Sequence, residues 1–161
     1  MHELIDIGQW GDTSRGEKWK YETPNTDSSI LEIIITYGDV VDSLSFRSTG
    51  ENVPSPPFGG TTGPESKTIT INGSTEYFNS ISGTIDTNPA GDIAVQSLTF
   101  GTNTGSYGPY PNTKFGTPFN VPLENGEIAG FHGYATEGTG GFINAIGIGA
   151  RIRSTGVLDP N

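Results

Sequence analysis

One six-residue pattern occurs three times in the chain, and this repeat constrains the fold more than any other feature. Val41–Phe46 is echoed by Val95–Phe100 and, more weakly, by Ile143–Ile148. Successive copies lie roughly fifty residues apart, so three units of similar length fill the chain. Each copy largely alternates apolar and polar side chains, which is typical of a half-buried antiparallel strand. The alternation slips at Asp42 and Ser43, and this slip predicts a β-bulge that redirects a side chain toward a loop.

Further segments accompany each copy and predict additional strands. An apolar strand precedes each copy and enters a glycine-bearing turn, at Leu31–Tyr37, Phe78–Ile85 and Ile128–Gly133. Another strand is expected ahead of it in each unit, at Lys18–Glu22, Lys67–Ile71 and Pro118–Leu123. No window of about eleven residues or more shows helical periodicity. The sequence therefore predicts an all-β fold in which three four-stranded antiparallel sheets with pseudo-threefold symmetry face a common axis. A single β-sandwich is the structural alternative.

The composition fits such a fold and limits the possible ligands. Of 161 residues, 24 are glycine, 11 are proline and 32% are hydrophobic, a profile shared by disordered polar chains and by all-β proteins rich in turns. The aromatic content of 10% favours a folded β protein, which we expect to be one domain over residues 1–161. The net charge of −10 argues against nucleic acid as a partner, because phosphate binding relies on lysine and arginine. An anionic membrane surface is disfavoured for the same reason.

Metals, cofactors and membrane insertion are not expected either. The chain has no cysteine, so no disulfide or thiolate metal site exists, and its acidic residues lack the spacing of an EF-hand loop. No apolar run approaches the roughly 20 residues of a membrane span. Met1–Leu4 lacks the basic and apolar regions of a secretory signal. We therefore expect a soluble, cytoplasmic protein without cofactor or metal, with secretion by way of a removed signal peptide left open.

Several segments carry a family resemblance. In the last third of the chain these are Gly108–Tyr110, Gly116–Phe119, Gly130–Gly133 and Ala145–Gly147. The glycine- and tryptophan-bearing opening Ile7–Gly11 and the segment Gly38–Asp42 extend the match to essentially the whole chain. In these residues the chain resembles the jacalin-related lectins of the mannose type. The resemblance implies a β-prism I fold of three Greek-key sheets, metal-independent sugar binding and no catalysis.

The resemblance also implies what such a protein binds, namely mannose-rich or glucose-containing glycans and glycoproteins. Contacts to a single sugar residue are few and exposed, so we expect weak binding at each site. Several sites, presented by a homodimer or a higher homo-oligomer, would then supply avidity. A galactose-type lectin and a β-prism interaction or structural domain with little sugar affinity are the alternatives.

The sugar site that the resemblance implies is a loop of the form Gly-x-x-x-Asp facing a second glycine-rich loop. A carboxylate accepts hydrogen bonds from neighbouring sugar hydroxyls, and glycine lets backbone amides approach closely. The first unit matches fully, with Gly38, Asp42 and the facing pair Gly59-Gly60, while Asp39 and Val40 offer backbone amides. From composition alone, the favoured interpretation is a hairpin turn at Gly38-Asp39 and a solvated strand residue at Asp42, and only the repeat and the resemblance together favour the site.

The third unit matches with one substitution. Gly140, Gly141, Phe142 and Asn144 face Gly16 at the end of an N-terminal glycine-bearing loop, and Asn144 replaces the aspartate of the family. An amide loses charge assistance, which costs on the order of 1 kcal/mol, or roughly tenfold in affinity. The resemblance makes this the main site of most members, so we expect a weakened site here. Phe142 either covers a sugar face or packs in the interior.

The second unit departs further from the pattern. Gln96 stands where the carboxylate is required, and no glycine pair faces it. Its side chain is longer and uncharged. The sequence therefore predicts no sugar site in this unit.

An enzyme is the remaining alternative, because a glycosidase needs two carboxyl groups across a sugar cleft. The closest pairs are Asp39 with Asp42 and Glu124 with Glu127. Residues three apart on a strand point to opposite faces, which argues against both pairs. His132 lies in a predicted strand, where a lone histidine is usually structural. We expect no catalytic residues.

Overall fold

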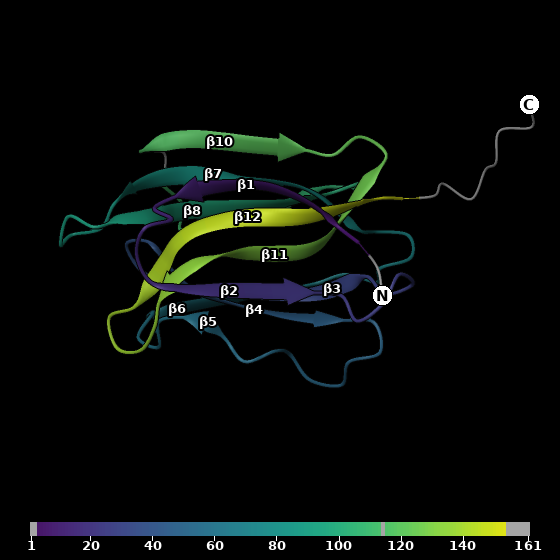
Figure 1. The fold of residues 1–161 in the computed structure, drawn as a ribbon, viewed down its shortest axis with the longest axis horizontal. Coiled ribbons are helices and arrows are strands. Elements are labelled where there is room, and N and C mark those ends of the chain that lie inside the picture. Colours follow the sequence, from purple (N-terminus) through teal and green to yellow (C-terminus); the bar gives the residue numbers. More distant parts are fainter. Residues whose placement is uncertain (1–2, 114, 154–161) are drawn as a thin grey trace, which may run out of the picture.

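The computed structural model describes residues 3–113 and 115–153 (Figure 1). Twelve strands and no helix occur in these residues, and the strands form three antiparallel sheets of four. The sheet of the first unit has the order β5 (Phe58–Gly59), β4 (Val41–Ser48), β3 (Ile30–Tyr37) and β6 (Glu65–Thr70). The sheet of the second unit has the order β10 (Thr117–Pro122), β7 (Phe78–Thr87), β8 (Ile93–Thr102) and β9 (Ser106–Tyr110). The sheet of the third unit has the order β1 (Ile5–Gly11), β12 (Phe142–Ile152), β11 (Gly126–Thr136) and β2 (Glu17–Glu22).

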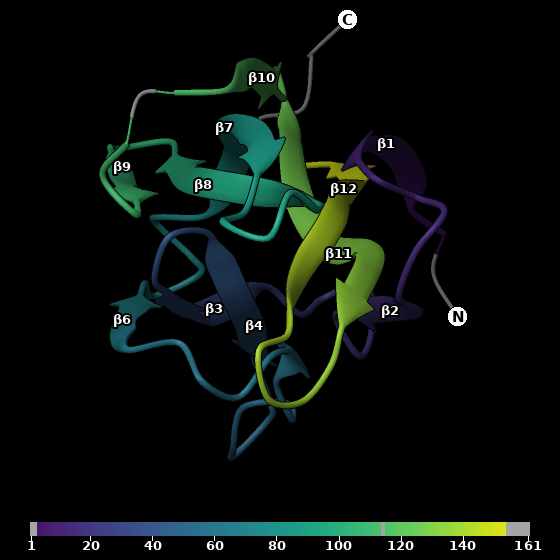
Figure 2. The same cartoon turned by 90° about the vertical axis from the view of Figure 1, so that its left-hand side faces the viewer.

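The three sheets share one topology and surround a common centre (Figure 2). In each, a hairpin formed by two long strands is flanked on both sides by the two strands of the next sequence segment. For the third unit that next segment is the N-terminal pair β1 and β2, so this sheet joins the two ends of the sequence. The predicted three-sheet architecture is confirmed.

The order of the flanking strands corrects one detail of the prediction. The strand expected ahead of the second unit is β6, and it pairs with β3 of the first unit. Likewise β10 pairs with β7 of the second unit, so β6 and β10 complete the hairpins that precede them, whereas β2 pairs with β11 and completes the last hairpin of the chain. The chain thus crosses from one edge of each hairpin to the other, as in a Greek key.

All three units contain the bulge that the first copy predicted. In the first unit Thr36 pairs with Ser43 and Tyr37 pairs with Val41, so Asp42 has no residue opposite it. The corresponding register shifts leave Gln96 unpaired in the second unit and Asn144 unpaired in the third. A bulge re-aims the side chain of its extra residue. The fold therefore presents one polar side chain at the same place in every sheet.

The interior is built from the apolar positions of the three copies. Those positions are fully buried: Val41, Leu44, Phe46, Val95, Leu98, Phe100, Ile143, Ile146 and Ile148. At the centre the ring of Phe131 stacks on Phe46 at 4.8 Å and meets Phe100 edge-on at 6.0 Å. These three rings come from three different sheets. Each large side chain buried in this way contributes about 1.5–3 kcal/mol to stability.

One end of the molecule carries the turns between β3 and β4, β7 and β8, and β11 and β12, and is called the loop end below. Val40, Ala94 and Phe142, one from each unit, form a small apolar cluster here that is separate from the main core. The cluster closes the interior at the place where the three turns meet.

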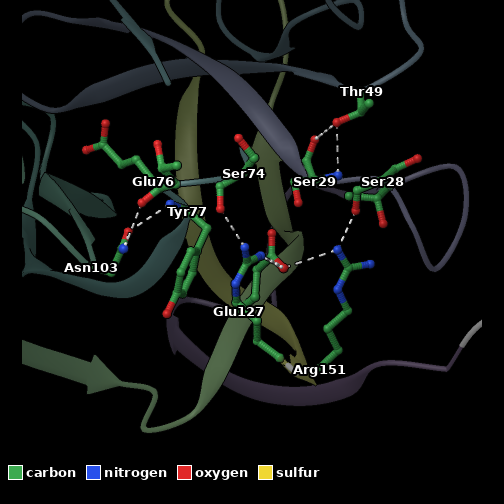
Figure 3. A network of polar contacts seen from close by, with 12 residues as sticks. Ser28, Ser29, Thr49, Ser74, Glu76, Tyr77, Asn103, Glu127 and Arg151 are labelled. Carbon is green, nitrogen blue, oxygen red and sulfur yellow. Dashed lines mark hydrogen bonds and ion pairs between the residues drawn. The ribbon is translucent and has the colours of Figure 1, made fainter. Parts of the chain in front are cut away.

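The opposite end is held by a buried carboxylate (Figure 3). Glu127 is 2% exposed and accepts hydrogen bonds from Arg151 at 3.2 Å and Arg153 at 2.9 Å. Arg151 also donates to the carbonyl oxygen of Ser28, and Arg153 donates to that of Ser74 at 3.0 Å. The end of β12 is thereby fixed to the loops that precede β3 and β7.

Nowhere in the described part of the chain is there a helix long and apolar enough to cross a membrane.

Candidate functional site

The bulge of the first unit holds a half-buried carboxylate at the loop end. The side-chain carboxylate of Asp42 accepts no hydrogen bond from the residues that the structure describes. Two glycines leave room around it. A Cβ atom at Gly63 would lie 2.6 Å from Oδ2 of Asp42, and one at Gly38 would lie 3.7 Å from it. Because glycine has no side chain, these two positions leave the carboxylate of Asp42, a strong hydrogen-bond acceptor, uncovered.

The surroundings of Asp42 disfavour its charge. Burial, and to a smaller extent the nearby carboxylate of Asp39, raise the pKa of this carboxyl to about 6. A carboxylate without hydrogen-bond donors in a partly desolvated position is free to accept bonds from a ligand. Perturbed groups of this kind are common at functional sites.

Backbone donors lie in the same turn. The N–H of Gly38 donates to the carbonyl oxygen of Val40 at 3.0 Å. The N–H groups of Asp39 and Val40 have no backbone acceptor among residues 3–113 and 115–153. Val40 as a whole is only 5% exposed, belongs to the apolar cluster of the loop end and lines the pocket described next.

The turn forms one wall of a pocket of about 480 Å³. Gly38, Asp39, Val40 and Asp42 line it together with Thr62 and Pro64 from the same unit. The second unit contributes Asn88 and Pro89, and the third contributes Gly140 and Phe142. The volume lies within the range of about 300–1,000 Å³ that is typical of ligand pockets. Three turns that are distant in sequence thus build one site.

The predicted facing pair Gly59-Gly60 lies against the backbone of Asp42 rather than in the pocket wall. The N–H of Gly60 donates to the carbonyl oxygen of Asp42 at 2.8 Å, and a Cβ at Gly59 would clash with that oxygen. The pair fixes the bulge. The pocket wall is formed by Thr62 and Pro64, which follow it.

The loop of the third unit is docked onto the first unit. Gly138 bridges to Gly60, and its carbonyl oxygen accepts from the N–H of Thr61 at 3.0 Å. The N–H of Gly140 donates to Oγ1 of Thr62 at 3.0 Å. Phe142 is 6% exposed and belongs to the apolar cluster of the loop end, so it packs while its edge lines the pocket.

Asn144 has a different environment from Asp42. It is 1% exposed, and its Oδ1 accepts from Oγ1 of Thr136 at 2.9 Å. Its Nδ2 is buried and has no partner within the described residues. Gly16 lies over it at φ +85°, where a Cβ would be 2.9 Å from Oδ1. Gly16, Gly141 and Asn144 do not line the pocket of Asp42.

Four wall residues, Thr62, Pro64, Asn88 and Pro89, were not predicted from the sequence. Asn and Pro in succession predict a turn at residues 88 and 89. Nothing in that local pattern indicates that the turn lies beside Asp42. Only the threefold arrangement brings them together.

The structure also corrects one argument about catalysis. Asp39 lies in the turn and Asp42 in the bulge, and both line the same pocket, so strand alternation does not separate them. Glu127, by contrast, is buried at the opposite end. Among the described residues, no group of three or more histidine, cysteine, aspartate or glutamate side chains is placed to hold a metal ion.

Comparisons with known proteins find relatives that are similar in sequence over most of this chain. The mannose/glucose-specific lectin of Parkia pendula is 40% identical over 150 residues, which are 89% of this chain and 31% of the relative. The agglutinin of Castanea crenata is 34% identical over 157 residues, which are 94% of this chain and 48% of that protein. The chain thus spans 31% and 48% of the length of these two relatives.

Solved structures agree with the fold. A mannose-binding jacalin-related lectin from Ananas comosus has a TM-score of 0.78 at 31% identity, covering 92% of this chain and 98% of that one. A mannose-specific jacalin-related lectin from Morus nigra, solved with mannose, has a TM-score of 0.78 at 30% identity, covering 94% and 97%. The sequence model of the family of jacalin-like lectin domains matches residues 7–149 of this chain. The chain, with its three-sheet β-prism, therefore belongs to the family of jacalin-like lectin domains.

Proposed function

We propose that the chain is a carbohydrate-binding lectin domain that recognises mannose- or glucose-type glycans without a metal and without catalysis. The observation that supports this most is the carboxylate of Asp42, which lacks a hydrogen-bond partner in the described structure and lies beside two free backbone N–H groups. Relatives named for mannose and glucose specificity support the choice of sugar. The proposal treats residues 1–161 as one domain, and a cytoplasmic location stays a prediction.

The proposed contacts follow from the chemistry of a sugar ring. Two neighbouring hydroxyl groups donate to the two oxygens of Asp42, and the N–H groups of Asp39 and Val40 donate to sugar oxygens. Hydrogen bonds to a charged acceptor are the stronger ones. Gly38 and Gly63 leave the space that the ring needs.

The third unit is proposed to contribute in two ways. Gly140 and Phe142 complete the pocket of Asp42. Gly16, Gly141 and Asn144 form a second, weaker site, in which the unpaired Nδ2 of Asn144 is the donor offered to a sugar. Because Asn144 is 1% exposed, Gly16 and its loop have to shift before a sugar binds there.

Affinity at each site is expected to be weak, near 1 mM or about −4 kcal/mol. A homodimer or higher homo-oligomer is proposed to raise the apparent affinity for mannose-rich glycoproteins by presenting several sites.

Titration calorimetry of Asp42→Ala and Asn144→Ala with methyl α-mannoside tests where the two proposed sugar sites lie. Asp42→Ala is expected to remove the stronger binding, whereas Asn144→Ala lowers only the number of sites. Far-UV circular dichroism and the unfolding temperature check that each variant is folded. Unchanged binding by folded Asp42→Ala protein would contradict the assignment of the main site.

A glycan array, with and without EDTA, tests the sugar class. Binding to mannose-rich glycans that EDTA does not change is expected. Binding to galactosides alone would contradict the sugar class, and no binding at high protein density would favour an interaction domain. Because Asp39 and Asp42 share a pocket, nitrophenyl mannosides and glucosides are tested for turnover, and none is expected.

A further inference from the structure

A second hollow lies directly beside the pocket of Asp42. It measures about 430 Å³ and reaches Gln96, Thr87, Pro111 and Thr113 in the second unit. Four residues line both hollows, namely Gly38, Asp39, Asn88 and Pro89. A ligand that extends past these shared residues contacts both spaces.

Gln96 occupies the bulge position that Asp42 occupies in the first unit. Its Oε1 accepts from Oγ1 of Thr84 at 3.1 Å, and its Nε2 donates to Asp86 over a long 3.5 Å. The amide is thereby oriented, and each of its polar atoms retains capacity for another hydrogen bond. An oriented amide both donates to and accepts from hydroxyl groups.

The residues that line both hollows form a rigid boundary between them, and Asn88 offers a hydrogen-bond donor at this boundary. Oδ1 of Asn88 accepts from the N–H groups of Ala90 at 3.0 Å and Asp92 at 2.9 Å. Its Nδ2 donates to none of the described residues, so it is available to a ligand. Pro89 restricts the backbone next to it, which lowers the entropy lost on binding.

The charges around the second hollow select a neutral ligand. Asp39 lines it, and Asp86 lies next to Gln96. The nearby cation of Arg15 is engaged with Asp92 at 2.7 Å. An anionic sugar such as a uronic acid would meet negative charge without a compensating partner among residues 3–113 and 115–153.

We propose that the two hollows form one extended site for a neutral, linear oligosaccharide of at least two residues. One sugar residue occupies the pocket of Asp42, and the next crosses Asn88 and Pro89 to reach Gln96 and Thr87. This inference rests on the proposed function of the Asp42 pocket. The second unit then has no independent site, in keeping with its sequence, but supplies a subsite to its neighbour.

The experiment compares methyl α-mannoside with α-linked mannobiose and mannotriose by calorimetry, on wild type, Gln96→Ala and Thr87→Ala. The wild type is expected to bind an oligosaccharide at least about fivefold more tightly than the monosaccharide, as one or two added hydrogen bonds provide. Each variant is expected to bring that ratio close to one. Thr87 is exposed, so Thr87→Ala keeps the test valid even if Gln96→Ala does not fold. Asn52→Ala, an exposed amide at the opposite end, is the matched control and keeps the wild-type ratio.

The outcomes separate the two proposals. Equal affinity of wild type for monosaccharide and oligosaccharide overturns the extended site and leaves the Asp42 site standing. A preference for oligosaccharide that survives in folded Gln96→Ala and Thr87→Ala protein overturns the placement of the subsite. Absence of binding to any of these sugars overturns the proposed function itself.

Discussion

The same bulge position carries Asp42, Gln96 and Asn144 in the three units, and their surroundings differ as much as their chemistry. Asp42 is half-buried, and its carboxylate has no hydrogen-bond donor among the described residues. Gln96 is held by Thr84 and Asp86, while Asn144 is buried against Thr136. Only the first therefore offers a charged acceptor that is ready for a ligand.

The pKa of Asp42 makes sugar binding depend on pH. Burial raises this pKa to about 6, so the carboxylate is charged at pH 8 and mostly protonated at pH 5. Protonation removes the charged acceptor, and affinity for methyl α-mannoside is expected to fall as the pH decreases through about 6. Calorimetry between pH 5 and 8 measures this. Asp42→Asn is expected to bind roughly tenfold more weakly at pH 8 and to show a flat profile. Wild-type binding that does not change over this range would contradict the role of Asp42.

The raised pKa of Asp42 affects stability and binding in opposite directions: as the pH decreases, binding weakens but the free energy of unfolding increases. Since the pKa of Asp42 is higher in the folded protein than the ordinary value of 3.8, the folded state binds the proton more tightly than the unfolded state. The free energy of unfolding therefore decreases as the pH rises from about 4 to 6. Asp42→Asn is expected to raise it at pH 8, on the order of 1 kcal/mol after allowance for solvent screening, and to leave it unchanged at pH 3. Urea unfolding at the two pH values checks this, and a destabilised variant at pH 8 would refute it.

At the scale of elements, the site depends on loops that approach one another through glycine. The carbonyl oxygen of Gly141 occupies the place where a Cβ of Gly60 would lie, which lets the third unit's loop lie on the first. Gly63 plays a similar part beside the carboxylate of Asp42. A side chain at Gly60 would collide with the backbone of Gly141, and one at Gly63 would displace the carboxylate of Asp42.

Gly63→Ala tests whether this space is the binding space. The new Cβ would lie 2.6 Å from Oδ2 of Asp42 and 3.0 Å from Oγ1 of Thr36, both ends of side chains that can move. We expect a folded protein whose affinity for methyl α-mannoside drops at least tenfold, because the carboxylate is displaced. Gly105→Ala is the matched control, since nothing lies within 4 Å of its Cβ. Equal affinity of both variants would show that the sugar binds elsewhere.

Most strands were predictable from the sequence, because eight to eleven residues of alternating pattern suffice to identify a long strand. Strands β4, β8 and β12 lie at the three repeat copies. The two-residue strand β5 is too short to show any period, and β9 contains Gly108 and Pro109, which obscure it. The pairing of β6 and β10 with the hairpins before them, and of β2 with the last hairpin, was missed, since local pattern does not encode which hairpin a flanking strand joins.

The candidate site was predictable only in part. The bulge and the motif around Gly38 and Asp42 follow from the repeat and the family resemblance. Thr62, Asn88 and Pro89 carry no motif, because their role arises from the meeting of three turns. The burial of Asn144 also depends on Gly16, which is far from it in the sequence. It depends as well on a hydrogen bond from Thr136 on the neighbouring strand, which the local sequence pattern does not indicate.

At the scale of the whole molecule, the pocket and the buried ion pairs lie at opposite ends. The loop end carries the pocket, and the opposite end carries Glu127 with Arg151 and Arg153 (Figure 3). The third sheet joins N-terminal and C-terminal strands between them. The distance along β11 from Glu127 to the pocket implies that stability and binding can be altered independently.

Glu127→Gln tests this separation. Glu127 is 2% exposed, and replacing its carboxylate leaves two arginines without the buried charge that they share. Loss of one partner in a buried ion pair costs about 3 kcal/mol, which is the decrease expected in the free energy of unfolding. Glu22→Gln, which breaks a partly exposed pair with Lys20, is expected to cost less than about 1 kcal/mol. Both folded variants should bind methyl α-mannoside like the wild type, and a large loss of binding in Glu127→Gln would contradict the independence of the two ends.

The central claim is that a sugar binds at the turn of Gly38 to Asp42, and a site-resolved titration tests it most directly. Methyl α-mannoside is added to ¹⁵N-labelled protein, and amide chemical shifts are followed by NMR. The account predicts saturable shifts at the free N–H groups of Asp39 and Val40, with smaller changes at Gly140 and none around Gly73 at the opposite end. Unchanged amide shifts of Asp39 and Val40 at saturating sugar, or shifts confined to another part of the molecule, would contradict it.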